Sequence, residues 1–374
     1  MGEIEMIFSG SPGRLPDIND IKRNGGSMMK ELNMALIGAG TWGTTHAAIY
    51  SEYSAVKFTG MCDVNRSKAE ALAAKYGIPA EHVYTDHREM LNRCPADAVA
   101  IVTPDFLHRD FAVDCAKAGK HMLVEKPLAT TRQDVEDVMN AVARAGVRMM
   151  VDLHNRFNPP FAVAKASLDS GEIGQPYSAY FRLNDIKWVA TDMLPWAAKS
   201  SILWFLGSHS LDTLRWFFSD EVERVYSVSR KGVLAAVGVD TEDIYQTILE
   251  FRGGGIATME NGWITPNSHS SVNDIKFNIT GTKGMFNLDL TNNQMIERFT
   301  ETKSDHLDVL VNHFVHGRAM GFAYQSIRHF VDRLLDGKPF LVTPEDAANT
   351  SLAILAVMES AAKHEIVKVR YLGD

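Results

Sequence analysis

Residues 34–43 read MALIGAGTWG, an apolar run that passes directly into the pattern GxGxxG at Gly38, Gly40 and Gly43. The run predicts a buried strand, and the segment after it predicts the start of a helix. The first glycine permits a tight turn, the second lets backbone approach a ligand, and the third lets the helix pack on the strand. A helix N-terminus at this point favours a phosphate, so the stretch predicts a dinucleotide-binding turn.

A carboxylate stands where the ribose of a bound dinucleotide requires one. Asp63 follows the apolar run 56–62 and lies about 20 residues after Gly43, the spacing typical of the carboxylate that binds the adenosine ribose. Its charge would repel a 2′-phosphate and so favours NAD, whereas Arg66 could bind that phosphate, which keeps NADP as an alternative. In this segment the expected cofactor contacts are Gly38, Gly40, Thr41, Trp42, Gly43, Asp63 and Arg66.

The first half of the chain alternates short apolar runs with stretches of helical periodicity. The runs predict strands at 34–37, 56–62, 98–102, 121–124 and 147–151. The periodic stretches predict helices at 65–76, 107–118 and 131–145. Strands separated by helices of this length indicate βαβ units and a parallel sheet.

The second half follows a different pattern, with alternating strands joined by glycine turns. Strands are predicted at 177–183, 222–228, 244–251, 256–263, 275–280 and 285–290, and helices at 160–168, 322–335 and 344–364. Consecutive hairpins indicate an antiparallel sheet half covered by helices. We therefore predict an α/β chain with an extension (1–32), a Rossmann domain (33–154), and an α/β domain with a large, mostly antiparallel open sheet that serves substrate binding and oligomerisation (155–374).

Composition excludes several classes of protein. The chain is 45% hydrophobic and 22% charged, with a net charge of −8 and no basic stripe, which argues against a nucleic-acid surface. No run approaches the roughly 18 apolar residues of a membrane span. The three cysteines, Cys62, Cys94 and Cys115, are too few and too scattered for a disulfide framework. We therefore expect a cytoplasmic protein.

Further segments carry a resemblance to a known family. They are 102–105 (VTPD), 125–127 (EKP), 155–159 (NRFNP) and 171–174 (GEIG). Together they resemble the Gfo/Idh/MocA family of glucose–fructose oxidoreductase, inositol dehydrogenase and their relatives, over roughly residues 34–371. The resemblance implies a sugar, polyol or related substrate and an open sheet that often forms a dimer interface. We accordingly expect a homo-oligomer, either a dimer or a tetramer.

The resemblance also implies a set of site residues. Those expected near the cofactor are Thr103, Pro104, His108, Glu125 and Lys126. Lys126 lies where parallel strands end, and an ammonium beside a substrate hydroxyl can stabilise a developing alkoxide. His209, in the stretch 206–212 (LGSHSLD), would be the general base, since an imidazole titrates near working pH. A buried core histidine is the alternative.

One position departs from the family pattern. Many active relatives carry an aspartate four residues before this histidine, where the chain has Phe205. A base-orienting or hydroxyl-binding carboxylate is therefore missing. For substrate binding we name Arg156, Trp188, Trp196 and Asp212, of which the two tryptophans are suited to stacking on a sugar ring or another flat ligand.

A second histidine pattern has a simpler interpretation. His313 and His316 form HxxH and His306 lies nearby, but nothing in the sequence supplies further ligands in a fixed geometry. We interpret the pair as part of a solvated or packed helix face and predict no metal site.

The leading hypothesis is an NAD(P)-dependent oxidoreductase that transfers a hydride between nicotinamide and a sugar, polyol or related hydroxy compound. Two alternatives stay open. One is a catalytically silent dinucleotide-binding sensor or regulator. The other is an NAD-retaining enzyme of the lyase or glycosidase type, in which transient oxidation drives an elimination.

Overall fold

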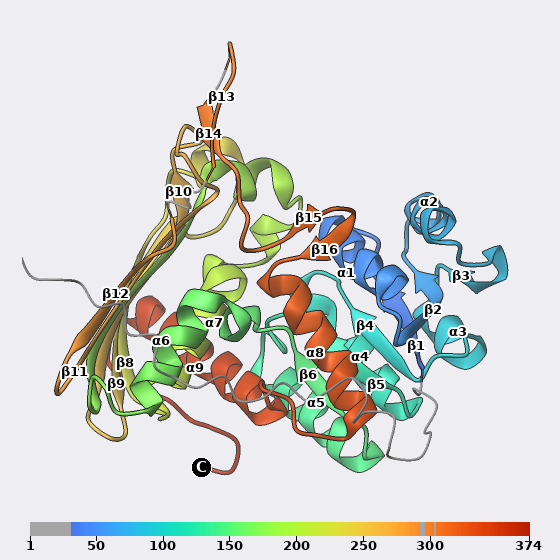
Figure 1. Ribbon diagram of the computed structural model, residues 1–374. Helices are drawn as coiled ribbons and strands as arrows, with labels where there is room; N and C mark the ends of the chain where they lie inside the picture. Colours follow the sequence, from blue (N-terminus) through green and yellow to red (C-terminus); the bar gives the residue numbers. More distant parts are fainter. Residues whose placement is uncertain (1–30, 292–295, 303) are drawn as a thin grey trace, which may run out of the picture.

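The computed structural model describes residues 31–291, 296–302 and 304–374, so the predicted extension lies almost entirely outside the described residues. Figure 1 shows two sheets on opposite sides of the molecule, with most of the helices between and around them. One sheet has six strands and the other has seven. This arrangement confirms the predicted fold class.

The first sheet is parallel, and its order is that of a Rossmann fold, β3-β2-β1-β4-β5-β6. Its strands are β1 (Leu32–Ile37), β2 (Val56–Cys62), β3 (Val83–Tyr84), β4 (Ala98–Ile101), β5 (His121–Val124) and β6 (Met149–Val151). Its helices are α1 (Thr41–Glu52), α2 (Arg66–Tyr76), α3 (His87–Arg93), α4 (His108–Lys117) and α5 (Arg132–Ala145). Strand β3 and helix α3 were not predicted, because a two-residue strand and a seven-residue helix are too short for periodicity to reveal.

The second sheet has the order β12-β11-β7-β10-β9-β8-β17 and is antiparallel except where β10 runs parallel to β7. Its strands are β7 (Pro176–Ile186), β8 (Val222–Arg230), β9 (Ile244–Phe251), β10 (Ile256–Thr265), β11 (Asn273–Gly281), β12 (Met285–Asp289) and β17 (Val367–Lys368). Helices α6 (Pro159–Asp169), α7 (Ser208–Phe218) and α9 (Pro344–Lys363) lie on the side that faces the Rossmann domain (Figure 1).

The outer face of this sheet carries no helix among the described residues (Figure 1). Apolar side chains on it are exposed, with Ile248 at 51% and Ile256 at 48% on neighbouring strands. Tyr226 lies directly opposite Ile248 on β8 and is also exposed. Charged pairs such as Arg182–Asp274 lie further along the same sheet.

Helix α8 (Phe322–Asp336) joins the two halves, because it packs against α1 of the Rossmann domain. Arg328 forms an ion pair with Glu52 at 2.9 Å, and Tyr53 donates a hydrogen bond to Asp332. These contacts hold the second domain over the carboxyl end of the parallel sheet, where ligands bind in such folds.

The stretch around the HxxH pair is not helical, so that part of the sequence interpretation is wrong. Residues between β12 and α8 include two hairpins, β13 (Glu297–Phe299) with β14 (Ser304–His306), and β15 (His313–Val315) with β16 (Arg318–Met320). His316 lies in the turn of the second hairpin at φ 51°, which gives the pair no shared helix face. No described helix is long and apolar enough to cross a membrane.

Candidate active site

The glycine loop at the carboxyl end of β1 is as tight as its sequence predicts. Gly38 has a φ of +106°, and a Cβ there would lie 2.0 Å from the Val102 carbonyl oxygen. A Cβ on Gly43 would lie 2.1 Å from the Gly38 carbonyl oxygen. Gly40 differs, since a Cβ built there meets nothing within 4 Å. The outer glycines are thus required by the protein's own packing, whereas the middle one leaves open space for a ligand.

The start of α1 is suited to an anion. Gly40 is the N-cap, no side chain caps the helix, and its first turn holds no acidic residue. The first backbone N–H groups therefore keep their hydrogen-bonding capacity for a phosphate. Thr41 and Trp42 form that first turn, and the indole N–H of Trp42 is buried without a hydrogen-bond partner. These features fit a dinucleotide.

Asp63 is tied to the glycine loop. One carboxylate oxygen accepts a hydrogen bond from the Ala39 N–H at 2.7 Å, and the other accepts from the Asn65 N–H at 2.7 Å. The side chain therefore braces the loop and presents its charge beside it. Arg66 forms an exposed ion pair with Glu70 at 2.7 Å, which directs the guanidinium along α2.

The loops after β4 and β5 are held together by one imidazole. Buried His108 contacts the Pro127 carbonyl oxygen through Nδ1 at 2.6 Å and the Thr103 carbonyl oxygen through Nε2 at 2.9 Å. The ring therefore braces the loops rather than facing a ligand. The Thr103 hydroxyl is buried without a partner, and Pro104 beside it is half-buried.

Lys126 reaches from the Rossmann domain into the second domain. Its ammonium donates a hydrogen bond to the Phe205 carbonyl oxygen at 2.6 Å and lies 4.1 Å from the centre of the Phe205 ring. Burial lowers the pKa of Lys126, and this effect outweighs the nearby carboxylates of Glu125, Asp105 and Asp185. A lysine whose charge is this poorly solvated is suited to proton exchange or to binding an oxyanion.

Aromatic side chains pack around the Phe205 ring that contacts this lysine. Trp196 packs edge-to-face against Phe205 on one side and against Phe106 on the other, each at 6.4 Å between ring centres. Trp196 therefore belongs to the same cluster as the lysine. Trp188 is 42% exposed, and its backbone N–H donates to the Asn267 side chain at 2.7 Å rather than linking it to the lysine.

His209 lies in the first turn of α7, buried, with Nδ1 lacking a hydrogen-bond partner. Its ring packs against that of His154, with 4.5 Å between ring centres. Burial, together with the charges of His154 and Lys126, brings the pKa of His209 well below the ordinary value. The imidazole is therefore neutral at neutral pH and able to accept a proton.

Arg156 and Asp212, both predicted to bind substrate, bind each other. The guanidinium donates to both carboxylate oxygens of Asp212, at 3.0 and 2.6 Å, and to Asp346 at 3.1 Å. Both partners are almost fully buried. Since their polar groups are satisfied by this pairing, neither is carried forward as a substrate ligand.

Two family models match the chain. An oxidoreductase family with an NAD-binding Rossmann fold, GFO_IDH_MocA, matches residues 32–153, and the GFO/IDH/MocA C-terminal domain matches residues 161–287. The matched segments make up more than half of the chain. The chain belongs to the Gfo/Idh/MocA oxidoreductase family. The predicted resemblance and the predicted class of cofactor are thereby confirmed.

Several named members of the Gfo/Idh/MocA family are similar to the chain. Inositol 2-dehydrogenase of Salmonella typhimurium is 26% identical over 82% of this chain and 87% of its own length. Levoglucosan dehydrogenase of Pseudarthrobacter phenanthrenivorans is 28% identical over 68% and 73%. The structure of scyllo-inositol dehydrogenase from Lactobacillus casei with NAD(H) and scyllo-inositol gives a TM-score of 0.75 at 21% identity, covering 91% of this chain and 99% of that one. That last likeness shows the shared fold.

Four ionisable residues around this Gfo/Idh/MocA site, three of them buried, were not predicted from the sequence. His46 binds Glu125 at 3.1 Å, and Asp152 lies 3.8 Å from His154. Burial raises the pKa of Asp185 to about 7, against the lowering effects of Lys126 and Asn273. The available signal was position: Asp152 and His154 directly follow the last parallel strand, where ligands bind. The four missed residues are His46, Asp152, His154 and Asp185.

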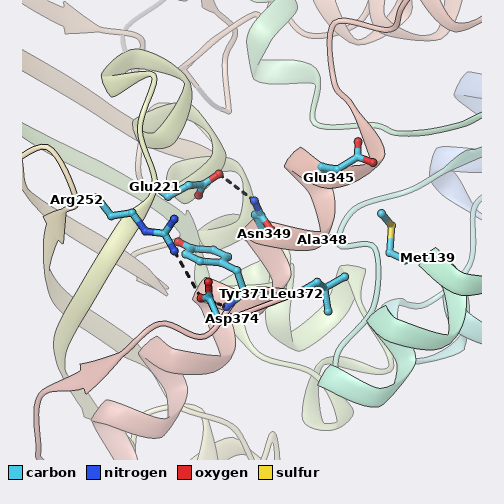
Figure 2. Close-up of a pocket in the computed structure, with 9 residues that line it drawn as sticks. All are labelled: Met139, Glu221, Arg252, Glu345, Ala348, Asn349, Tyr371, Leu372 and Asp374. Atoms are coloured by element: carbon cyan, nitrogen blue, oxygen red, sulfur yellow. Dashed lines mark hydrogen bonds and ion pairs between the residues drawn. The ribbon is translucent and has the colours of Figure 1, made fainter.

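A separate pocket of about 250 Å³ lies near the C-terminus (Figure 2). Its lining includes Glu221, Arg252, Asn349 and Asp374, with Glu221 bound to Asn349 and Arg252 paired with Asp374. None of its lining residues belongs to the glycine loop or to the surroundings of Lys126. We do not assign the family's chemistry to this pocket.

The Asp63 geometry generates a prediction about cofactor choice. Replacing Asp63 by Ala removes an acceptor for the ribose hydroxyls and the negative charge that repels a 2′-phosphate, so NAD affinity should fall and the NAD/NADP preference should narrow. Dissociation constants for both cofactors, measured by titration, check this. Lys117→Ala, at an exposed position on α4, serves as the control. An unchanged ratio of the two constants in the Asp63 variant would contradict the assignment.

Proposed function

We propose that the chain is an NAD-dependent oxidoreductase that transfers a hydride between nicotinamide and a CH–OH group of a sugar, polyol or related hydroxy compound. One observation carries the proposal. The Lys126 ammonium reaches the Phe205 carbonyl oxygen, one helical turn before His209, so a lysine from the cofactor domain and a neutral histidine from the other domain serve one cleft. The relatives named as inositol and levoglucosan dehydrogenases support this class of substrate.

In this proposal the two side chains divide the proton chemistry. His209 is neutral and takes the hydroxyl proton as the C–H bond breaks, because the unprotonated nitrogen of a neutral imidazole is a competent base. Lys126 stabilises the negative charge that develops on the substrate oxygen. NAD, when bound, supplies the hydride acceptor. Burial of both groups strengthens these interactions by excluding water.

The presence of both Lys126 and His209 also bears on the two alternatives, the sensor and the elimination enzyme. A sensor that only binds dinucleotide has no need of a buried lysine and a buried neutral histidine, both of which are costly to keep out of water. An elimination enzyme would use the same pair without net reduction of NAD. Incubation with NAD and a panel of sugars and polyols separates the three: net NADH formation indicates the dehydrogenase, turnover without it the elimination enzyme, and binding alone the sensor.

The division of proton chemistry predicts the effect of removing either group. Lys126→Ala and His209→Ala should each lower kcat by at least about 100-fold, since positioned acid–base groups contribute about that much or more, while NAD affinity stays nearly unchanged. Steady-state kinetics and NAD titration measure the two effects separately. Lys117→Ala, at an exposed position on α4, is the control. Near wild-type turnover of Lys126→Ala on a confirmed substrate would refute the catalytic assignment.

Phe205 generates a prediction about specificity. Its ring lies 4.1 Å from the Lys126 ammonium, so a carboxylate in Phe205→Asp would lie beside that charge and could bind a substrate hydroxyl. We expect the variant to raise kcat/KM for polyols relative to less hydroxylated substrates. Phe205→Asn, which is nearly isosteric with Asp but uncharged, is the matched control. Equal selectivity in all three proteins would show that this position does not determine specificity.

The outer face of the second sheet supports a homo-oligomer. Exposed Ile248 and Ile256 on neighbouring strands form part of an apolar surface of the kind that protein interfaces cover. We expect sedimentation at micromolar concentration to give a multiple of the 41.5 kDa chain mass. Ile248→Asp should shift the protein toward the monomer, whereas Val163→Asp, at an exposed site on α6, should not. A wild-type protein that sediments as a single chain would contradict the prediction.

A further inference from the structure

A second imidazole lies between the dinucleotide loop and His209. His154 begins the short turn after β6, at the boundary of the two domains. Its ring centre is 5.8 Å from that of Trp42 on α1, 5.4 Å from that of Phe322 on α8, and 4.5 Å from that of His209 on α7. The His154 and His209 rings are tilted by 38° to each other. Two ionisable rings are therefore in contact inside the site.

One carboxylate lies behind this second imidazole. Asp152 is fully buried, and its Oδ2 is 3.8 Å from His154 Nδ1, which is ion-pair distance but too long for a hydrogen bond. Oδ2 has no hydrogen-bond partner, whereas Oδ1 accepts from the Ser326 hydroxyl on α8. The oxygen nearest His154 therefore has capacity for a charged partner.

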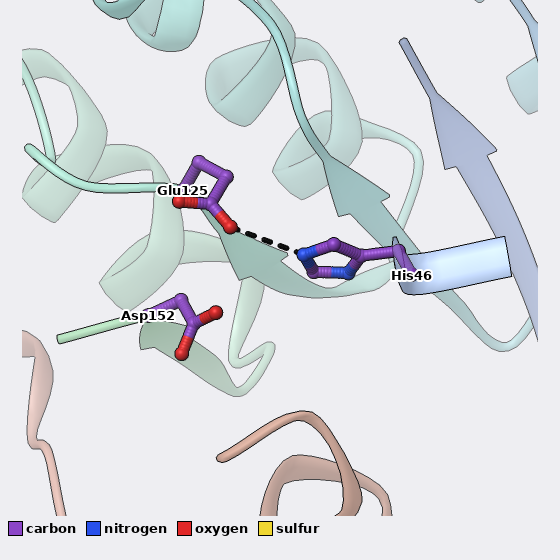
Figure 3. A group of neighbouring side chains, drawn as sticks. All are labelled: His46, Glu125 and Asp152. Atoms are coloured by element: carbon purple, nitrogen blue, oxygen red, sulfur yellow. Dashed lines mark hydrogen bonds and ion pairs between the residues drawn. The ribbon is translucent and has the colours of Figure 1, made fainter. Parts of the chain in front are cut away.

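The remaining neighbours of Asp152 form a closed network (Figure 3). One ring nitrogen of His46 and one carboxylate oxygen each of Glu125 and Asp152 lie within 4.8 Å of one another. His46 uses both of its ring nitrogens, one toward Glu125 and the other toward the Tyr50 hydroxyl, each at 3.1 Å. A hydrogen-bonded network therefore accounts for this cluster, and it leaves the free oxygen of Asp152 to His154.

Electrostatics make the two imidazoles compete for one proton. Two positive rings at 4.5 Å in a buried site repel each other strongly. The charge of Lys126 lowers the pKa of His209, whereas the nearest carboxylate, Asp152, lies beside His154, so a proton shared by the two rings is disfavoured on His209. Burial alone would raise the pKa of Asp152, but contacts with His154, His46 and Ser326 outweigh it and lower that pKa.

We propose that Asp152 and His154 are positioning residues that keep His209 free of its proton. Asp152 holds a shared proton on His154, and the resulting charge excludes a second proton from the neighbouring ring, so the site keeps an available base even as the solution becomes acidic. The role of His209 as the general base rests on the proposed function. The competition between the two rings does not depend on it.

Side-chain NMR of the full-length protein tests the competition without a substrate. The chain has 13 histidines, so the His209 resonance is identified by its loss in His209→Gln. In His154→Gln the titration midpoint of His209 should rise by about one pH unit, because the repelling charge is gone. In Asp152→Asn it should rise too, because His154 then loses the partner that holds its proton. In the double variant, the titration midpoint of His209 should rise no further than it does in His154→Gln alone.

The control is His364→Gln, an exposed histidine after α9, which should leave the His209 midpoint unchanged. A midpoint that stays or falls in His154→Gln and Asp152→Asn overturns the inference. With a confirmed substrate, the acidic limb of the kcat/KM profile should move upward by the same amount. Midpoints that move as expected in a protein that oxidises no hydroxy compound would refute the proposed function and support the inference.

Discussion

The position of one ammonium group determines much of the geometry of the site. Lys126 extends from the carboxyl end of the parallel sheet and binds a backbone carbonyl oxygen of the other domain at 2.6 Å. For this contact to form, α8 must hold the two domains together through contacts such as Arg328 with Glu52, and the loop that carries the lysine must be fixed by His108. A small rotation between the domains would withdraw the ammonium from the turn that precedes His209. The arrangement of Lys126 and His209 is therefore a property of the interface between domains, which neither domain contains alone.

Burial gives these groups their chemical character. In water, the lysine would be an ordinary cation and the histidine would titrate near its usual pKa. Inside the cleft, desolvation lowers the pKa of Lys126 and of His209, and it raises the pKa of Asp185 to about 7. All three changes favour the uncharged form of the side chain. Few ionised groups and little water then screen any charge that forms in the site. A reaction that creates an alkoxide is stabilised most in such surroundings, because little solvent competes for the lysine.

The sequence was sufficient to predict a structural feature wherever that feature follows from a local rule. The glycine loop could be predicted because Gly38 and Gly43 are required by contacts of the loop with its own strand and helix, and Asp63 because its spacing follows from the length of one βα unit. The mutual pairing of Arg156 with Asp212 could not, since it joins residues far apart in the chain whose spacing carries no period. The hairpins after β12 were missed for a related reason, because three-residue strands leave no alternation to detect.

Residue 205 shows where local and tertiary information must be combined. The family resemblance implies a carboxylate at this position that the chain lacks, which leaves Lys126 without that acidic neighbour. The structure supplies an aromatic face in its place, worth roughly 1–2 kcal/mol to a partly desolvated cation, and a buried carboxyl group, Asp185, from β7. Burial raises the pKa of Asp185 to about 7, so this carboxyl group is a weaker counter-ion for the lysine than an ordinary aspartate. An aromatic ring cannot accept strong hydrogen bonds from a polyol as a carboxylate does. For the proposed substrates, residue 205 therefore offers fewer hydroxyl contacts than a carboxylate would.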